Sequence, residues 1–182
     1  MMNVVTSSVF RSAEEVLKSS MPEVTADSLD HEASESDEPL GPVIWNIPGF
    51  CGAARVATAF GDLPIEALRL RDEIRTSAGS MVRVQWIDKL HLDADFVNKH
   101  PDARPVRILA NSFARGRPMK DMLVAPRQEL CADPHVATRF QTALDLCARA
   151  RAHRVQSNGL TYYRFHCGEP VCVRVEGVWV RV

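Results

Sequence analysis

Residues 100–126 read HPDARPVRILANSFARGRPMKDMLVAP and contain two short apolar runs on either side of a polar loop. The runs PVRILA (105–110) and DMLVAP (121–126) are rich in aliphatic residues and have the length of strands. Gly116 and Pro118 lie between them, where both residue types are typical of a loop. The stretch therefore predicts two strands separated by a loop.

Similar short runs along the chain predict further strands. In MVRVQWI (81–87), Val82, Val84 and Trp86 alternate with polar residues, which puts them on one face of a strand. In the last run the alternation of valines changes phase at Gly177, which predicts a bulge or a tight bend there. The predicted strands cover residues 43–47, 54–60, 81–87, 160–166 and 171–182.

One segment departs from the strand pattern and predicts a helix over about 133–152. Asp133 is a suitable N-cap, and Pro134 suits the first helical position. Apolar residues then recur at helical spacing, and arginines gather at the end, where cations stabilise the helix dipole. These residues are Val136, Phe140, Leu144, Cys147, Arg149, Arg151 and Arg154. Because strands and helices do not alternate, the pattern favours an all-β fold with one inserted helix.

The first 42 residues differ in composition from the rest of the chain. Residues 1–40 contain nine acidic and two basic residues, a net charge of −7, whereas the remaining residues carry +6. Residues 21–42 are too poor in large apolar side chains to offset their ordering entropy, so we expect them to be disordered. Ser12 and Glu15 fit a capping box, which predicts a short helix over 12–18. We therefore expect an acidic, largely disordered arm (1–42) and one domain (43–182).

The overall composition is that of an average folded domain, with 46% hydrophobic and 25% charged residues and a net charge of −1. This balance gives no indication of nucleic-acid or membrane binding. The N-terminal residues lack the pattern of a secretory signal, and no apolar run reaches the roughly 20 residues that span a bilayer. A cytoplasmic location is the default expectation. The five cysteines have no framework spacing, so we expect thiols.

Five segments, in the right order, resemble the Hint domain, the hedgehog/intein module, and in particular a bacterial branch found in proteins of alphaproteobacterial type. The most specific is the stretch quoted first, where the family has R-P-V-R-I and then G-x-P-x-x-D-L-x-V-S-P. RVATAFGDLPIEALRLRDEIRT resembles the family's opening motif, and VRVQWID resembles its P-V-x-W-I strand. The five segments are 55–76, 82–88, 100–126, 159–165 and 175–180, within 45–182 and outside the helical 129–156. The resemblance implies a Hint-like fold of many short strands.

The resemblance also implies a chemistry. In Hint domains a cysteine thiol attacks the carbonyl of the preceding residue, and a second nucleophile resolves the thioester. A histidine in a Thr-x-x-His element usually protonates the leaving amide nitrogen. Intein splicing also requires a terminal Asn, whereas this chain ends in VWVRV, so the resemblance does not predict splicing.

The reacting positions of the family are not matched in this chain. Aligning RVAT without gaps places the nucleophile slot at Gly49, and a two-residue deletion in the loop would let Cys51 fill it instead. The histidine slot falls on Gln128, and an amide does not titrate, so it cannot protonate the leaving nitrogen. The other replacements are Ala125 for a hydroxyl residue, Arg164 for a His, Gly168 and Pro170 for an Asp and a His, and Arg71 for a turn glycine.

Two functional hypotheses remain open at this point. The first is a catalytically degenerate Hint domain that acts as an interaction or structural module, with a protein as its partner. The second is an active cysteine autoprotease, in which the Cys51 thiol attacks the Phe50 carbonyl by an N-to-S acyl shift and releases residues 1–50. Cys51 has no neighbouring base in the sequence, so one would have to approach through the fold. The candidates are His91, His100, His135, His153 and His166.

Other chemically suggestive residues have structural interpretations. HCGEPVC (166–172), with Cys167 and Cys172, and the pair Cys131 and His135 contain zinc-ligand types but lack the two close cysteine pairs of a structural site, so we predict no metal or cofactor. The basic run RARAHR (149–154) lacks interleaved aromatic residues, so we expect a solvated surface or an attraction to the acidic arm. Further basic residues are Arg104, Arg107, Arg115, Arg117 and Lys120, and the aromatic residues expected in the core or in cross-strand packing are Trp86, Tyr162, Tyr163 and Trp179.

Overall fold

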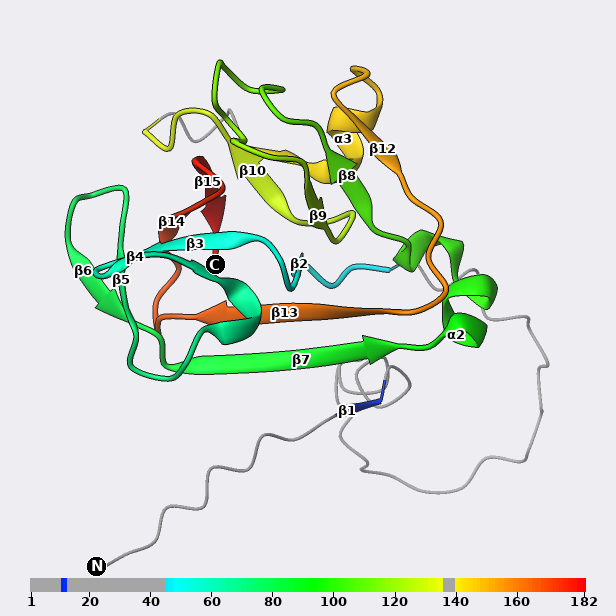
Figure 1. Ribbon diagram of the computed structural model, residues 1–182, viewed down its shortest axis with the longest axis horizontal. Coiled ribbons are helices and arrows are strands. Elements are labelled where there is room, and N and C mark those ends of the chain that lie inside the picture. The colour runs from blue at the N-terminus through cyan, green and yellow to red at the C-terminus, as the bar shows by residue number, and fades with distance from the viewer. Residues whose placement is uncertain (1–10, 13–44, 136–139) are drawn as a thin grey trace, which may run out of the picture.

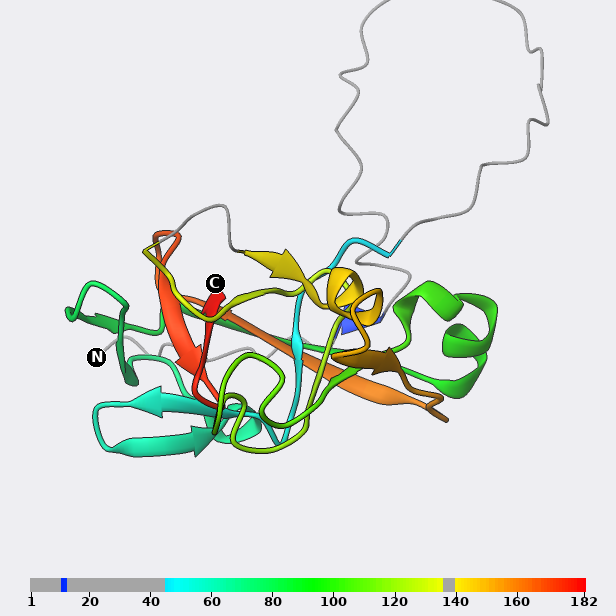
Figure 2. The ribbon, with the colours of Figure 1, turned by 90° about the horizontal axis from the view of Figure 1, so that it is seen from above.

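The computed structural model describes residues 11–12, 45–135 and 140–182, and it confirms the all-β fold (Figure 1). Two sheets of short strands share one core (Figure 2). The described helices, which connect strands along the chain, are three to six residues long. Most of the predicted acidic arm lies outside the described residues. So does the predicted N-terminal helix, except Ser12, which belongs to a two-residue strand.

The first sheet has the order β1-β7-β13-β2-β9-β8-β12. Its longest pair is β7 (Trp86–Leu92) and β13 (Leu160–His166), which run antiparallel beside each other in Figure 1. β13 confirms the strand predicted over 160–166. The two runs of the stretch 100–126 form β8 and β9, which pair with each other. The remaining bounds are β1 (Arg11–Ser12), β2 (Phe50–Cys51), β8 (Val106–Ile108), β9 (Met122–Val124) and β12 (Ala152–Arg154).

The second sheet has the order β11-β10-β15-β14-β3-β5-β6, and β4 pairs with β3. β14 (Cys172–Val175) and β15 (Val178–Arg181) form a hairpin. Its turn residues Glu176 and Gly177 both have positive φ angles, 49° and 81°, so the tight bend predicted at Gly177 is confirmed as a two-residue turn. The remaining bounds are β3 (Arg55–Thr58), β4 (Gly61–Pro64), β5 (Glu73–Arg75), β6 (Met81–Arg83), β10 (Glu129–Cys131) and β11 (Gln141–Thr142).

The helix predicted over about 133–152 is wrong. The helix in this region, α3, covers only Ala143–Cys147, between β11 and β12. It begins at a capping box in which Thr142 and Asp145 each accept the other's backbone N–H, and Ala150, with φ of 55°, follows its end. The flanking segments pair with β10 and β8, so hydrogen bonding at open sheet edges overrides the helical spacing of the sequence.

The strand predicted over 43–47 is also wrong for the residues that the structure describes. Residues 45–47 have no strand partner and no regular secondary structure. The indole Nε1 of Trp45 donates a hydrogen bond to the carbonyl of Ile47 at 3.0 Å. The Trp45 and Ile47 side chains are nevertheless buried. The apolar residues of this run therefore indicate a buried segment, but not a strand that pairs with another.

Two other strands are shorter than the sequence pattern predicts. The run 81–87 is interrupted between β6 and β7, because the Val84 backbone bonds to the turn at 71–72. Val84 is buried while Trp86 is 39% exposed, so the predicted common face is wrong. The run 54–60 ends at Thr58, and Gly61 already begins β4.

The described residues form two apolar clusters. The larger one fills the space between the two sheets and includes Phe50, Val56, Ile74 and Val124. The smaller one joins residues of β7 and β13 to Val97 of α2 (Ala94–Lys99) and Ala103 of η2 (Pro101–Ala103). In Figure 1, α2 lies at one end of β7. A third short helix, η1 (Ile65–Ala67), follows β4. Within the described ranges, every helix is too short or too polar to cross a bilayer.

Candidate functional site

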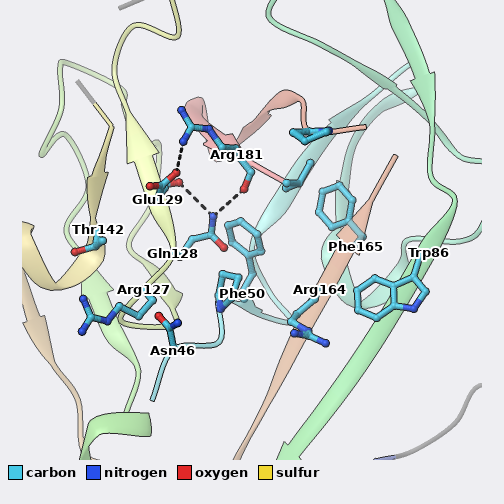
Figure 3. Close-up of a pocket in the computed structure, with 14 residues that line it drawn as sticks. Asn46, Phe50, Trp86, Arg127, Gln128, Glu129, Thr142, Arg164, Phe165 and Arg181 are labelled. Atoms are coloured by element: carbon cyan, nitrogen blue, oxygen red, sulfur yellow. Dashed lines mark hydrogen bonds and ion pairs between the residues drawn. The ribbon is translucent and has the colours of Figure 1, made fainter. Parts of the chain in front are cut away.

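A pocket of about 570 Å³ opens between the segment before β2 and the end of β15 (Figure 3). One wall comes from β10, the segment before it and β11, and the opposite wall comes from β7 and β13. Phe50 lies between the two walls. The lining residues are Asn46, Pro48, Gly49, Phe50, Trp86, Arg127, Gln128, Glu129, Thr142, Arg164, Phe165, Pro170, Arg181 and Val182.

Four positions that the sequence alignment assigns to reacting groups line this single pocket. They are Gly49, Gln128, Arg164 and Pro170. They come from segments up to about 120 residues apart, and the fold brings them to one place. Ala125, a fifth aligned position, is buried next to them, and its backbone N–H donates to the Gly49 carbonyl at 2.8 Å.

The backbone at Gly49 is closely enclosed. A Cβ atom at this position would lie 3.2 Å from the Tyr162 Cβ and 3.4 Å from the Arg164 Cγ. These distances are short for carbon contacts, so any side chain here requires its neighbours to move by a few tenths of an ångström. Glycine therefore fits this position sterically, and it provides no nucleophile.

Gln128 connects two strands at the back of the pocket. Its side chain is 2% exposed, and its amide Nε2 donates to the carbonyls of Glu129 and Arg181 at 3.2 and 3.3 Å. Both amide hydrogens are thus used by backbone acceptors of β10 and β15 (Figure 3). A primary amide has no titratable proton near neutral pH, so this residue holds the strands together and does not act as a general acid.

Cys51 lies outside the pocket. It is half-buried and packs against the smaller apolar cluster, which contains Trp45, Leu90 and Tyr162. Burial disfavours the charged thiolate and raises the pKa of the Cys51 thiol to about 12. Activated cysteines have lowered pKa values and cationic neighbours, so the surroundings of Cys51 are those of a structural thiol.

In the described structure, the histidines considered as bases for Cys51 have other contacts or are exposed to solvent. His166 stacks on Trp86 with ring centroids 5.3 Å apart, and its Nδ1 accepts the Gly168 N–H. His91 bonds to the Thr161 hydroxyl, and His100 packs against the Phe96 ring. His135 and His153 are exposed. None of these five histidines lines the pocket.

The raised pKa of Cys51 predicts slow alkylation. At pH 8 the folded protein should hold on the order of a thousandfold less Cys51 thiolate than the unfolded chain, whose cysteine pKa is about 8.5. The rate should rise with pH up to about 12. The free energy of unfolding should fall over the same window, because the folded state retains a proton that the unfolded state releases. Iodoacetamide labelling, read by peptide mass spectrometry with and without denaturant, measures the ratio, and equal rates in both states would contradict the prediction.

Three arginines line the pocket, and two of them are paired with carboxylates. Arg164 Nη2 pairs with Asp88 Oδ2 at 2.6 Å, and its guanidinium lies 5.1 Å from the Trp86 ring centroid. Arg181 pairs with Glu129 at 2.8 Å, and the two side chains are 44% and 40% exposed. Arg127 is half-buried and forms no ion pair within the described part of the chain. The sequence analysis missed Arg127, Arg181 and Glu129, because an isolated charge beside a short strand carries no local signal of a site.

The remaining candidates have structural surroundings. Among residues 45–135 and 140–182, no three His, Cys, Asp or Glu side chains come together as a metal site. Cys131 and Cys167 are buried free thiols. Tyr162 is fully buried and donates a hydrogen bond to the Ala103 carbonyl at 2.8 Å, which confirms the expected core position. Trp86 confirms the expected cross-strand packing, since it lies opposite His166 in the sheet.

The fold is similar to that of inteins with solved structures. It matches the crystal structure of the MchDnaB-1 intein with a TM-score of 0.50 and 10% identity, over 73% of this chain and 99% of that one. The DnaB intein from Synechocystis sp. PCC 6803 gives a TM-score of 0.47 and 10% identity, over 75% and 99%. No curated protein matches the chain. The Hint domain family matches residues 48–181, and the chain therefore belongs to this family.

Proposed function

We propose that this Hint domain has lost self-cleavage and acts as an interaction module, with the central pocket as its binding site. The observation that supports this most is the composition of that pocket. Gly49, Gln128, Arg164 and Pro170 occupy the aligned reacting positions, and none of them offers a thiol or a proton that transfers near neutral pH. The pocket remains open, and its arginines and aromatic rings suit binding rather than acyl transfer.

The alternative proposal, cleavage before Cys51, has less support. It requires a thiolate at a position where burial raises the pKa to about 12. It also requires an acid for the amide nitrogen of residue 51, and none of the described histidines hydrogen-bonds to Cys51. An N-to-S acyl shift is fast only when a thiolate attacks the carbonyl and an acid protonates the leaving nitrogen, and Cys51 has neither advantage.

Intact mass spectrometry of the purified full-length chain distinguishes the two functions. We expect one species with the mass of residues 1–182, unchanged after prolonged incubation with dithiothreitol, which would intercept any thioester. Cys51→Ala is the matched control and should behave identically. Two fragments that meet between Phe50 and Cys51, and that disappear in the Cys51→Ala variant, would overturn the proposal.

A further inference from the structure

We propose that the pocket binds an acidic peptide segment of a partner protein, with a carboxylate held by the arginines and an apolar side chain on the pocket floor. This proposal rests on the proposed loss of cleavage, because an active domain would fill the same pocket with its own scissile junction. Three separate observations support the proposal: the position of Arg164, the apolar floor of the pocket, and the net charge of the pocket.

The first observation concerns Arg164. Its Nη2 is held by Asp88, and its guanidinium carbon lies 5.1 Å from the Trp86 ring centroid, so two neighbours fix the position of the guanidinium. Its Nε is buried and has no hydrogen-bond partner in the described structure. Nε is closed off from solvent, so a ligand carboxylate would bind the part of the Arg164 side chain that stays accessible, since this side chain is 24% exposed.

The second observation is the floor of the pocket. Phe50 and Phe165 form its base, with ring centroids 6.5 Å apart, and Pro48 and Pro170 flank them. Trp86, 39% exposed, extends this apolar surface to the rim. A floor of this kind takes an aliphatic or aromatic side chain, and a volume of about 570 Å³ accommodates a few residues of an extended peptide.

The third observation is the charge balance of the lining. Arg127, Arg164 and Arg181 line the pocket together with one carboxylate, Glu129, and Arg164 is also paired with Asp88 outside the lining, which leaves a net charge of +1. The pair between Arg181 and Glu129 is exposed on both sides, so it is weak and exchanges readily with a ligand carboxylate. Arginine forks bind carboxylates in two parallel hydrogen bonds, which makes the site selective for Asp and Glu over their amides.

Peptide arrays test this specificity with the full-length protein. Eight-residue peptides carry Asp or Glu on both sides of one apolar residue, and each is matched by its Asn or Gln version. We expect roughly tenfold or greater preference for the acidic peptides, in accord with the strength of charge-assisted hydrogen bonds. Equal binding of acidic and amide peptides, or no binding of either, would overturn the proposal.

Variants locate the binding to the pocket. Arg127→Ser should weaken the best acidic peptide roughly tenfold, and Arg164→Lys should do so while keeping the charge beside Asp88. Arg115→Ser is the matched control, because Arg115 is exposed on a distant loop and does not line the pocket. An equal loss in the Arg115 variant would assign binding to overall charge and refute the site. Intact mass of the same samples reports cleavage separately, so failure of binding and failure of the proposed function are distinguishable.

Discussion

Phe50→Ala should lower the free energy of unfolding by about 3–5 kcal/mol, the usual cost of removing a buried phenylalanine ring. Phe50 is 2% exposed and belongs to the cluster between the sheets. It lies on β2, which pairs with both β13 and β9, so its loss leaves a cavity at the centre of the first sheet. Since domains of this size are stable by about 5–15 kcal/mol, the variant should unfold at a much lower urea concentration.

The chain contains a matched control for this prediction. Phe60 is the same residue type, but it is 95% exposed on the turn between β3 and β4. Phe60→Ala should change the free energy of unfolding by no more than about 0.5 kcal/mol. Urea titrations of both variants, followed by tryptophan fluorescence, measure the difference. Equal losses for the two substitutions would contradict the position of Phe50 in the shared core.

The strand over 160–166 was predictable from its length and its β-branched and aromatic residues, whereas alternation alone over 81–87 was misleading. The run 160–166 is a strand over its whole predicted length, because it pairs with all seven residues of β7. The hairpin at Gly177 was also predictable, since a change of phase at a glycine has few structural explanations. In contrast, β2 has only two residues, and so short a strand carries no periodicity.

The wrong helix shows why the remaining elements were not predictable. The helical spacing over 133–152 reflects only the local preference of this segment. In the fold, the segment supplies β11 and β12, which pair with the otherwise open edges of β10 and β8. Pairing with these edges depends on residues far away in sequence, so no local pattern reports it. Among the described residues of this range, the five residues of α3 are helical.

The candidate site was predictable in part, through alignment rather than through chemistry. The register of RVAT selected Gly49, and the structure places Gly49 beside Gln128 and Arg164 in one pocket. No single one of these residue types suggests a site. Cys51, the residue with the most chemical interest in the sequence, lies outside the pocket because strand alternation turns it toward the smaller cluster.

Arg164→Met should lower the free energy of unfolding by about 2–3 kcal/mol. Arg164 lies directly opposite Asp88 in the pairing of β13 with β7, and the two side chains are 24% and 9% exposed. Removing the arginine leaves the Asp88 carboxylate desolvated and unpaired, which typically costs about 3–5 kcal/mol in a fully buried pair. Water reaches Arg164 in part, so we expect the lower figure.

The ion pair between Arg83 and Glu73 is the matched comparison, because it also joins neighbouring strands. Its side chains are 68% and 38% exposed. Arg83→Met should therefore cost less than about 1 kcal/mol, since water solvates the remaining carboxylate. In the double variant Arg164→Met with Asp88→Asn, part of the loss should return, because the unpaired charge is gone. Urea titration of the three variants measures these differences, and equal costs at Arg164 and Arg83 would mean that Asp88 is hydrated in solution. Such a result would also remove the fixed guanidinium on which selective binding of a carboxylate in the pocket depends.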